Sequence, residues 1–167
     1  MNIKVKYFNE DYPKMEKIEQ GDWIDLRVDN IKEWESERYI LSGTDKDKLA
    51  KLPMVDSSIK YKEGDILFLG LGVAMELPEG YEAHVLPRSS TFKKTGFILT
   101  NGMGIIDNKY CGDDDEWKAM VSCTRDGIIN RHDKLFQFRI VENQPKLNFN
   151  EVEVLNNKNR GGFGSTD

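Results

Sequence analysis

The sequence predicts an all-β protein, and three observations support this prediction. Short apolar runs recur along most of the chain, too closely spaced for helices to lie between them. Several runs alternate apolar and polar residues, which is the period of a half-buried strand. Glycine, proline, asparagine and aspartate gather between the runs and mark turns. Many short strands at this spacing are typical of a sandwich, barrel or jelly roll, and not of a parallel sheet covered by helices.

The expected strands follow one another along the chain. Ile3, Val5 and Tyr7 alternate with lysines, so the first strand has one apolar and one polar face. A Gly-Asp turn precedes the second expected strand, residues 23–28. The remaining expected strands are residues 65–71, 73–77, 81–86, 98–101, 118–123, 135–141 and 152–155.

The length of 167 residues is enough for one domain with one core, so we expect a single domain over residues 1–167. Residues 29–62 are charged and uneven in pattern, and we interpret them as an insertion. Residues 159–167 are small or turn-prone around one aromatic side chain. They cannot fold alone, and we expect a mobile C-terminal arm.

Composition limits the kinds of partner. The formal net charge is −5, which argues against a nucleic-acid polymer because phosphate neutralisation needs a basic face. A single nucleotide needs only a few local cations and stays possible. No apolar run is long enough to cross a membrane, and the N-terminus does not look like a signal peptide. Two cysteines and two histidines show no metal-ligand spacing, so we expect a cytoplasmic protein with free thiols.

The most informative stretch is residues 101–112, which is typical of a hairpin. A short apolar strand enters Asp107, a polar turn follows at Asn108 and Lys109, and the chain returns through Tyr110. Asp107 has two interpretations. It can cap the turn by accepting backbone N–H groups, as aspartate often does. Alternatively, it is a carboxylate that a rigid element holds against a ligand.

Three other segments also have two interpretations each. Residues 87–91, Pro-Arg-Ser-Ser-Thr, either cap a helix or bind phosphate through Arg88, Ser89, Ser90 and backbone N–H groups. Gln137 lies in an apolar strand, either on a solvent face or against a ligand. The tail is a disordered end or a ligand-binding arm: Arg160, Ser165 and Thr166 suit phosphate oxygens, and Phe163 suits stacking on a base.

In order, residues 21–28, 87–91, 101–112, 134–138 and 160–166 resemble the five motifs of the trimeric dUTP pyrophosphatases (dUTPases). The hairpin reads G-x-I-D-x-x-Y-x-G and the C-terminus reads R-G-G-F-G-S-T. The resemblance spans nearly the whole chain except residues 29–62, and it is greatest to dUTPases of Gram-positive bacteria and their phages. It implies a jelly-roll-like subunit, a homotrimer with shared active sites, and Mg²⁺ held by the triphosphate without direct protein ligands.

The resemblance also implies residue roles in hydrolysis of dUTP to dUMP and pyrophosphate. Asp107 would activate the water that attacks the α-phosphorus, and Asp25 would organise the site and its metal-bound waters indirectly. Tyr110 would pack under the deoxyribose. The remaining implied substrate-binding residues are Asn101, Gly104 and Ile106 for uracil, Arg88, Ser89, Ser90 and Gln137 for phosphate, and Arg160, Phe163, Gly164, Ser165 and Thr166 in the arm. Lys134 stands where the fourth motif usually has arginine.

Two rival functions follow from the same resemblance. A dCTP deaminase shares the fold, but it needs another carboxylate on the strand after the hairpin, and residues 118–122 have none. A phage or prophage regulatory protein could use the same scaffold, with residues 29–62 as the segment that binds a protein partner. The acidic run at residues 113–116 is interpreted as a solvated loop, with metal binding as an alternative that no other feature of the sequence supports.

Overall fold

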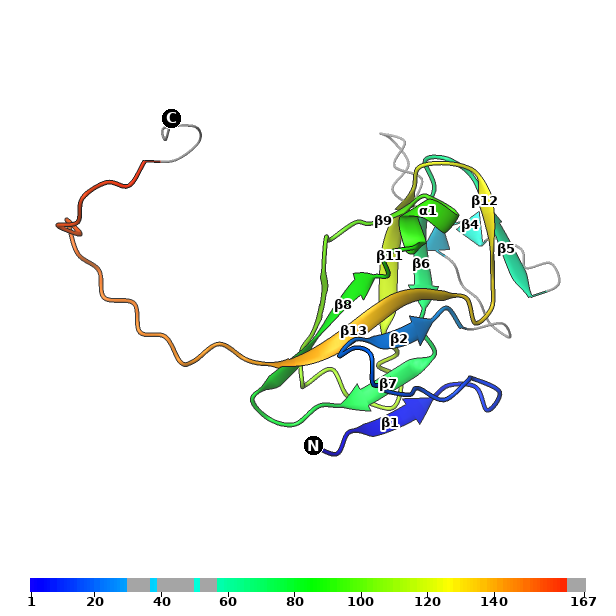
Figure 1. Cartoon of the computed structure of the whole chain (residues 1–167), viewed down its shortest axis with the longest axis horizontal. Coiled ribbons are helices and arrows are strands. Elements are labelled where there is room, and N and C mark those ends of the chain that lie inside the picture. Colours follow the sequence, from blue (N-terminus) through cyan, green and yellow to red (C-terminus); the bar gives the residue numbers. More distant parts are fainter. Residues whose placement is uncertain (30–36, 39–49, 52–56, 162–167) are drawn as a thin grey trace.

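The computed structural model describes residues 1–29, 37–38, 50–51 and 57–161. These residues form a body made almost wholly of strands, and a C-terminal segment that leaves the body and runs away from it (Figure 1). The described part of the chain contains a single helix of five residues. The all-β prediction is therefore confirmed. The elements are β1 (Lys4–Tyr7), β2 (Ile24–Arg27), β3 (Glu37–Arg38), β4 (Ala50–Lys51), β5 (Ser58–Tyr61), β6 (Ile66–Gly70), β7 (Val73–Glu76), β8 (Tyr81–Pro87), α1 (Thr91–Thr95), β9 (Phe97–Leu99), β10 (Gly104–Ile106), β11 (Lys118–Cys123), β12 (Gly127–Asn130) and β13 (Lys134–Glu142).

The strands pair antiparallel throughout the described residues. The largest sheet has the order β10-β8-β13-β2, and a second sheet has the order β6-β11-β9. Three strand pairs accompany them: β1 with β7, β5 with β12, and β3 with β4. Strands far apart in sequence thus lie side by side, as β2 and β13 do, which is a feature of jelly-roll topologies.

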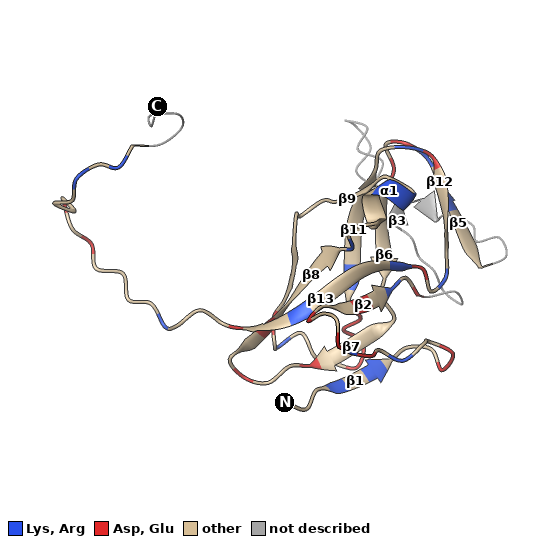
Figure 2. Ribbon diagram, viewed as in Figure 1, with Lys and Arg blue, Asp and Glu red and all other residues tan. Residues whose placement is uncertain are grey.

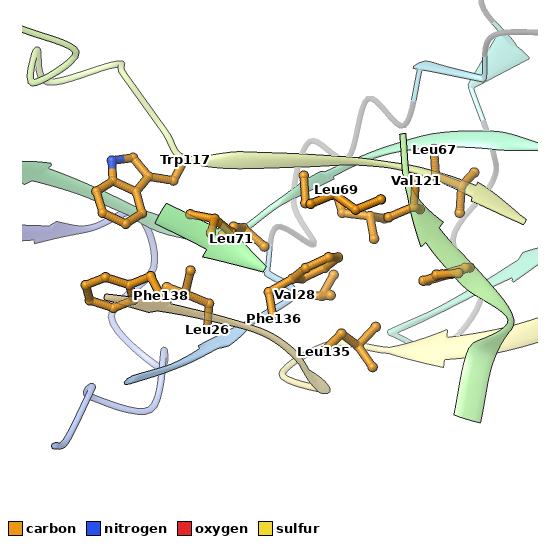
Figure 3. Packing of buried hydrophobic residues seen from close by; sticks show 14 of the residues in the cluster. Leu26, Val28, Leu67, Leu69, Leu71, Trp117, Val121, Leu135, Phe136 and Phe138 are labelled. Atoms are coloured by element: carbon orange, nitrogen blue, oxygen red, sulfur yellow. The ribbon is translucent and has the colours of Figure 1, made fainter. Parts of the chain in front are cut away.

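The core lies between the two larger sheets. Figure 3 shows Leu26, Phe136 and Phe138 of the first sheet facing Leu69 and Val121 of the second. All five side chains are at most 2% exposed. Trp117, which is fully buried, meets Phe138 edge to face at 5.3 Å between ring centroids. Each such side chain contributes about 1.5–3 kcal/mol on burial, so these contacts fix how the two sheets stack.

The C-terminal strand expected at residues 152–155 is absent, and this prediction was wrong for the isolated chain. Val152, Val154 and Leu155 are 55%, 64% and 79% exposed. The segment has the composition of a strand, but no other strand lies beside it among the described residues. A strand is stable only when its backbone groups pair with a neighbour.

Both ends of the range 29–62 belong to the body. Asp29 is fully buried and lies two residues after the end of β2. At the other end, β5 pairs with β12 and buries Ile59 and Tyr61, which are 1% and 4% exposed. Most residues between these ends lie outside the described part, and the interpretation of that stretch as an insertion stays a prediction.

Candidate active site

Asp25 is the centre of a charged cluster on the largest sheet. Its Oδ1 lies 2.7 Å from Nε of Arg88, and its Oδ2 lies 3.1 Å from Nζ of Lys134. Gln137 is the residue opposite Asp25 on β13, so both side chains lie on the same face of the sheet. The side chains of Asp25 and Arg88 are 29% and 31% exposed, so the cluster is open to a ligand from solvent.

Backbone contacts hold the arginine segment against β13. The N–H of Arg88 donates to the carbonyl of Leu135 at 3.0 Å, and Nη1 of Arg88 donates to the carbonyl of Lys134 at 3.4 Å. In return, Nε2 of Gln137 donates to the carbonyl of Pro87 at 3.2 Å. The segments that contain Asp25, Arg88 and Gln137 are far apart in the sequence, and they meet at one end of β8, as expected for parts of one site.

The two interpretations of residues 87–91 are partly resolved by the helix that follows. Helix α1 does begin at Thr91, with Ser90 at its N-cap position, but the side chain of Ser90 makes no capping hydrogen bond. Ser89 is exposed. Ser89 and Ser90 therefore follow Arg88 directly in the chain, and the side chain of Ser90 does not serve as a helix cap.

Asp107 follows β10 and caps the turn that was predicted for it. Its Oδ1 accepts a hydrogen bond from the N–H of Lys109 at 2.8 Å, and its carbonyl accepts one from Tyr110 at 3.0 Å. The side chain is exposed, so its other carboxylate oxygen can still contact a ligand or a water. Capping and chemistry are therefore compatible at this residue.

The return through Tyr110 is not a strand, which corrects the expectation of a hairpin. The hydroxyl of Tyr110 donates instead to the carbonyl of Glu116 at 3.1 Å, and Asp115 caps the N–H of Gly112 at 2.7 Å. Residues 110–116 thus form a loop closed by these contacts, and among the described strands β10 pairs with β8 alone. Tyr110 is 40% exposed, and the partial burial of its hydroxyl raises the pKa of Tyr110.

The other residues expected to bind uracil lie around β10. Asn101 is exposed in the turn before it, where its carbonyl accepts from Met103 at 2.7 Å. Gly104 and Ile106 are the two ends of β10. A Cβ at Gly104 would lie 3.3 Å from Cβ of Val85, so glycine allows β10 to pack closely on β8.

The structure does not bring Asp107 and Arg88 of one chain together. Ile106 pairs with Ala83 near the start of β8, whereas Phe136 pairs with Pro87 at its end. These two positions are about 13 Å apart at roughly 3.3 Å per residue, and Asp107 and Arg88 lie beyond them in opposite directions. Within one chain the expected site is in two halves.

The acidic run at residues 113–116 is only partly the solvated loop that was expected. Glu116 is 7% exposed, and its Oε1 accepts the N–H of Gly72 at 2.9 Å. Burial raises the pKa of Glu116, and the nearby charge of Asp29 adds to this effect. Sequence reasoning missed this buried carboxyl, because in the sequence Glu116 looks like the end of an exposed acidic run.

The arm is described only as far as residue 161. Arg160 is exposed, while Phe163, Gly164, Ser165 and Thr166 lie outside the described residues. Residues 143–161 run away from the body, and in Figure 2 basic and acidic segments alternate along them. The expected roles of the arm residues therefore stay predictions.

Within the described ranges, no three His, Cys, Asp or Glu side chains form a group that could hold a metal ion. Both oxygens of Asp25 already face cations of the protein. A divalent cation at this site would therefore depend on a ligand for most of its coordination. Among the same residues, no helix is long and apolar enough to cross a membrane.

Comparison with known proteins gives a consistent result. The family model described as dUTPase matches residues 55–167. The chain is 42% identical over 166 residues to an SPbeta prophage-derived deoxyuridine 5′-triphosphate nucleotidohydrolase of Bacillus subtilis, with 99% of this chain and 98% of the relative covered. It is 37% identical over 118 residues to a deoxyuridine 5′-triphosphate nucleotidohydrolase of Hydrogenobaculum sp., which covers 67% of this chain and 78% of the relative.

Solved structures support the fold. A dUTPase from phage phi11 of S. aureus matches with a TM-score of 0.65 at 16% identity, covering 93% of this chain and 99% of that chain. A Staphylococcus bacteriophage 80alpha dUTPase matches with a TM-score of 0.65 at 15% identity, covering 98% and 97%. Together with the family model and the prophage relative, these matches lead to one conclusion: the chain belongs to the dUTPase family.

Proposed function

We propose that this protein hydrolyses dUTP to dUMP and pyrophosphate. The observation that carries the proposal is the cluster in which Arg88 and Lys134 flank Asp25 at the end of β8. Two cations on a half-exposed face suit a triphosphate, and the chain belongs to a family whose curated members are named deoxyuridine 5′-triphosphate nucleotidohydrolases.

When phosphate binds, Arg88 and Lys134 would exchange contacts with Asp25 for contacts with phosphate oxygens. Arg88 presents a planar fork that can contact two phosphate oxygens, whereas Lys134 acts as a point charge. The amide of Gln137 and the hydroxyls of Ser89 and Ser90 add neutral hydrogen-bond donors. Asp25 keeps both cationic side chains in place before the substrate arrives. Few side chains therefore have to be immobilised on binding, which lowers its entropic cost.

Magnesium is the expected cofactor, bound through the triphosphate with Asp25 as the nearest carboxylate of the cluster. The phage phi11 relative is described with a coordinated structural Mg(II) ion. Bound at the phosphates, Mg²⁺ would neutralise charge and fix the phosphate chain for in-line attack.

Asp107 would act as the general base. Its exposed carboxylate, held by the turn that it caps, can accept a proton from the water that attacks the α-phosphorus. Tyr110 would pack under the deoxyribose and leave no room for a 2′-hydroxyl. Backbone groups of Asn101, Gly104 and Ile106 would pair with the uracil edge, and cytosine would leave those groups unpaired.

We further propose that the sites are shared between subunits of a homotrimer. The two halves of the site lie at opposite ends of β8, so Asp107 of one subunit would complete the cluster around Arg88 of another. Arg160, Phe163, Gly164, Ser165 and Thr166 would then close over the bound nucleotide from a neighbouring arm.

The stem of the arm, which we define as residues 143–158 between β13 and the arm, supports this arrangement. Residues 151–154 alternate Glu and Val, and all four are exposed. Strand β1 alternates exposed lysines with apolar residues, and the apolar residues line a groove of about 190 Å³ between β1, β2 and β13. A neighbour's stem laid along β1 would place Val152 and Val154 in the groove and its glutamates opposite Lys4 and Lys6.

The direct test is incubation of the purified protein with dUTP, dCTP, dTTP and UTP in the presence of Mg²⁺, with pyrophosphate and ammonia measured separately. We expect pyrophosphate from dUTP alone. Ammonia from dCTP would show a deaminase, and equal hydrolysis of UTP would contradict the role given to Tyr110.

A further inference from the structure

Strand β13 contains a bulge immediately beside the charged cluster. Lys134 pairs with Arg27 and Phe136 pairs with the next residue of β2, Leu26, so Leu135 is an extra residue in β13. The bulge is also visible in the burial pattern, because Leu135 and Phe136 are both buried although they are consecutive. In a regular strand, consecutive side chains point to opposite faces.

The bulge decides which side chains face Asp25. Lys134 and Gln137 are three residues apart, and in a regular strand they would lie on opposite faces of the sheet. With one extra residue between them, both face the same side as Asp25, and Nζ of Lys134 reaches Oδ2 of Asp25. Bulges often re-aim side chains next to active sites in this way.

The carbonyl of the extra residue has two donors. The N–H of Arg88 lies 3.0 Å from the carbonyl oxygen of Leu135, and the hydroxyl of Thr91 lies 2.5 Å from it. Thr91 is fully buried, and its own N–H donates to the carbonyl of Arg88 at 2.9 Å. One threonine thus connects the arginine segment to the bulge.

We propose that Thr91 is a positioning residue, whose buried hydroxyl holds the Leu135 bulge so that Lys134 and Gln137 both face the substrate phosphates. It acts through other side chains and touches no reacting atom. The effect expected on KM rests on the proposed hydrolysis of dUTP, whereas the effect expected on the position of Lys134 does not.

Three variants distinguish loss of the Thr91 hydroxyl from a general effect on folding. Thr91→Val keeps the shape and removes the hydroxyl, whereas Thr91→Ser keeps the hydroxyl and removes the methyl group. The matched control is Thr95→Val, one turn later in α1, where a buried hydroxyl donates to the carbonyl of Thr91 at 2.8 Å. We expect Thr91→Val to raise KM for dUTP about tenfold with a smaller effect on kcat, as loss of one buried hydrogen bond to a positioned group would do. Thr91→Ser and Thr95→Val should leave KM near the wild-type value.

A double variant tests the route of the effect. In a Lys134→Met background, Thr91→Val should raise KM much less than in the wild type, because the side chain that it positions has been removed. An unchanged KM in folded Thr91→Val, an equal rise in Thr95→Val, or a full additional rise in the double variant would each overturn the proposal. Thr91→Ala supplies a second hydroxyl-free variant if Thr91→Val does not fold.

A structural measurement keeps this inference separate from the proposed function. Crystal structures of the wild type and Thr91→Val, both without nucleotide, report the distance between Nζ of Lys134 and Oδ2 of Asp25. We expect the contact at 3.1 Å to persist in the wild type and to be lost in the variant. An unchanged contact in the variant would reject the positioning role. Absence of dUTP hydrolysis by the wild type would instead reject the proposed function.

Discussion

Asp25 and Glu116 are carboxylates of the same domain with opposite surroundings. Asp25 is partly exposed and faces the side chains of Arg88 and Lys134. Glu116 is buried beside Gly70 and Gly72, where a Cβ at Gly70 would lie 2.6 Å from its Oε1. Burial disfavours the charged form of Glu116 and raises its pKa, which matches a structural role. Asp25 instead contacts two cationic side chains on an open face, which matches a binding role.

The raised pKa of Glu116 makes a prediction for stability against pH. A carboxyl that binds its proton more tightly in the folded than in the unfolded state contributes stability below its ordinary value of 4.5. That contribution is lost as the pH rises through the folded-state pKa, and above it the ionised group is a net cost.

Glu116→Gln keeps an oxygen to accept the N–H of Gly72 and removes the charge. We expect its thermal midpoint to exceed the wild-type value at about pH 8 and to match it at about pH 4. Asp114→Asn, in the exposed part of the same run, is the control and should show no such pH-dependent difference. A Glu116→Gln variant that is less stable than the wild type at the higher pH would contradict this account.

At the scale of elements, alternation located most of the strands. Strand β11 has the predicted limits, and β7 and β8 differ from prediction by one residue at the C-terminal end. Strand β5 was missed because it lies at the end of a charged stretch, and β12 was missed because it has only two apolar side chains, which are consecutive. The bulge at Leu135 was missed as well, although two consecutive apolar residues in an alternating strand were a signal for it.

The missed β5–β12 pair supplies a second prediction. Ile59→Ala removes a side chain that is 1% exposed, and it should lower the free energy of unfolding by about 2–5 kcal/mol, the usual effect of truncating a buried isoleucine. Ile128→Ala, on the exposed face of the partner strand, should change it by about 0.5 kcal/mol or less. Denaturant unfolding of both variants measures the difference. Equal values would show that β5 does not belong to the core.

For the whole molecule, the sequence motifs identified the residues of the candidate site but not how one chain distributes them. Asp25, Arg88 and Gln137 converge as expected, because their segments are neighbours in one sheet. Asp107 lies at the other end of β8, and only the strand register reveals this. Similarly, the strand composition of residues 152–155 has no partner strand among the described residues, and the proposed contact with a neighbouring chain would supply one.

The shared site is tested most directly by mixing two inactive proteins. Asp107→Asn keeps an oxygen that can cap the turn and removes the base, and Arg88→Met removes the phosphate-binding fork. Each variant should hydrolyse dUTP poorly alone. Unfolded and refolded together, they should form mixed trimers in which an intact Arg88 of one chain meets an intact Asp107 of another, so activity returns. If each site belonged to a single chain, every site would lack one of the two residues, and verified mixed trimers would stay inactive.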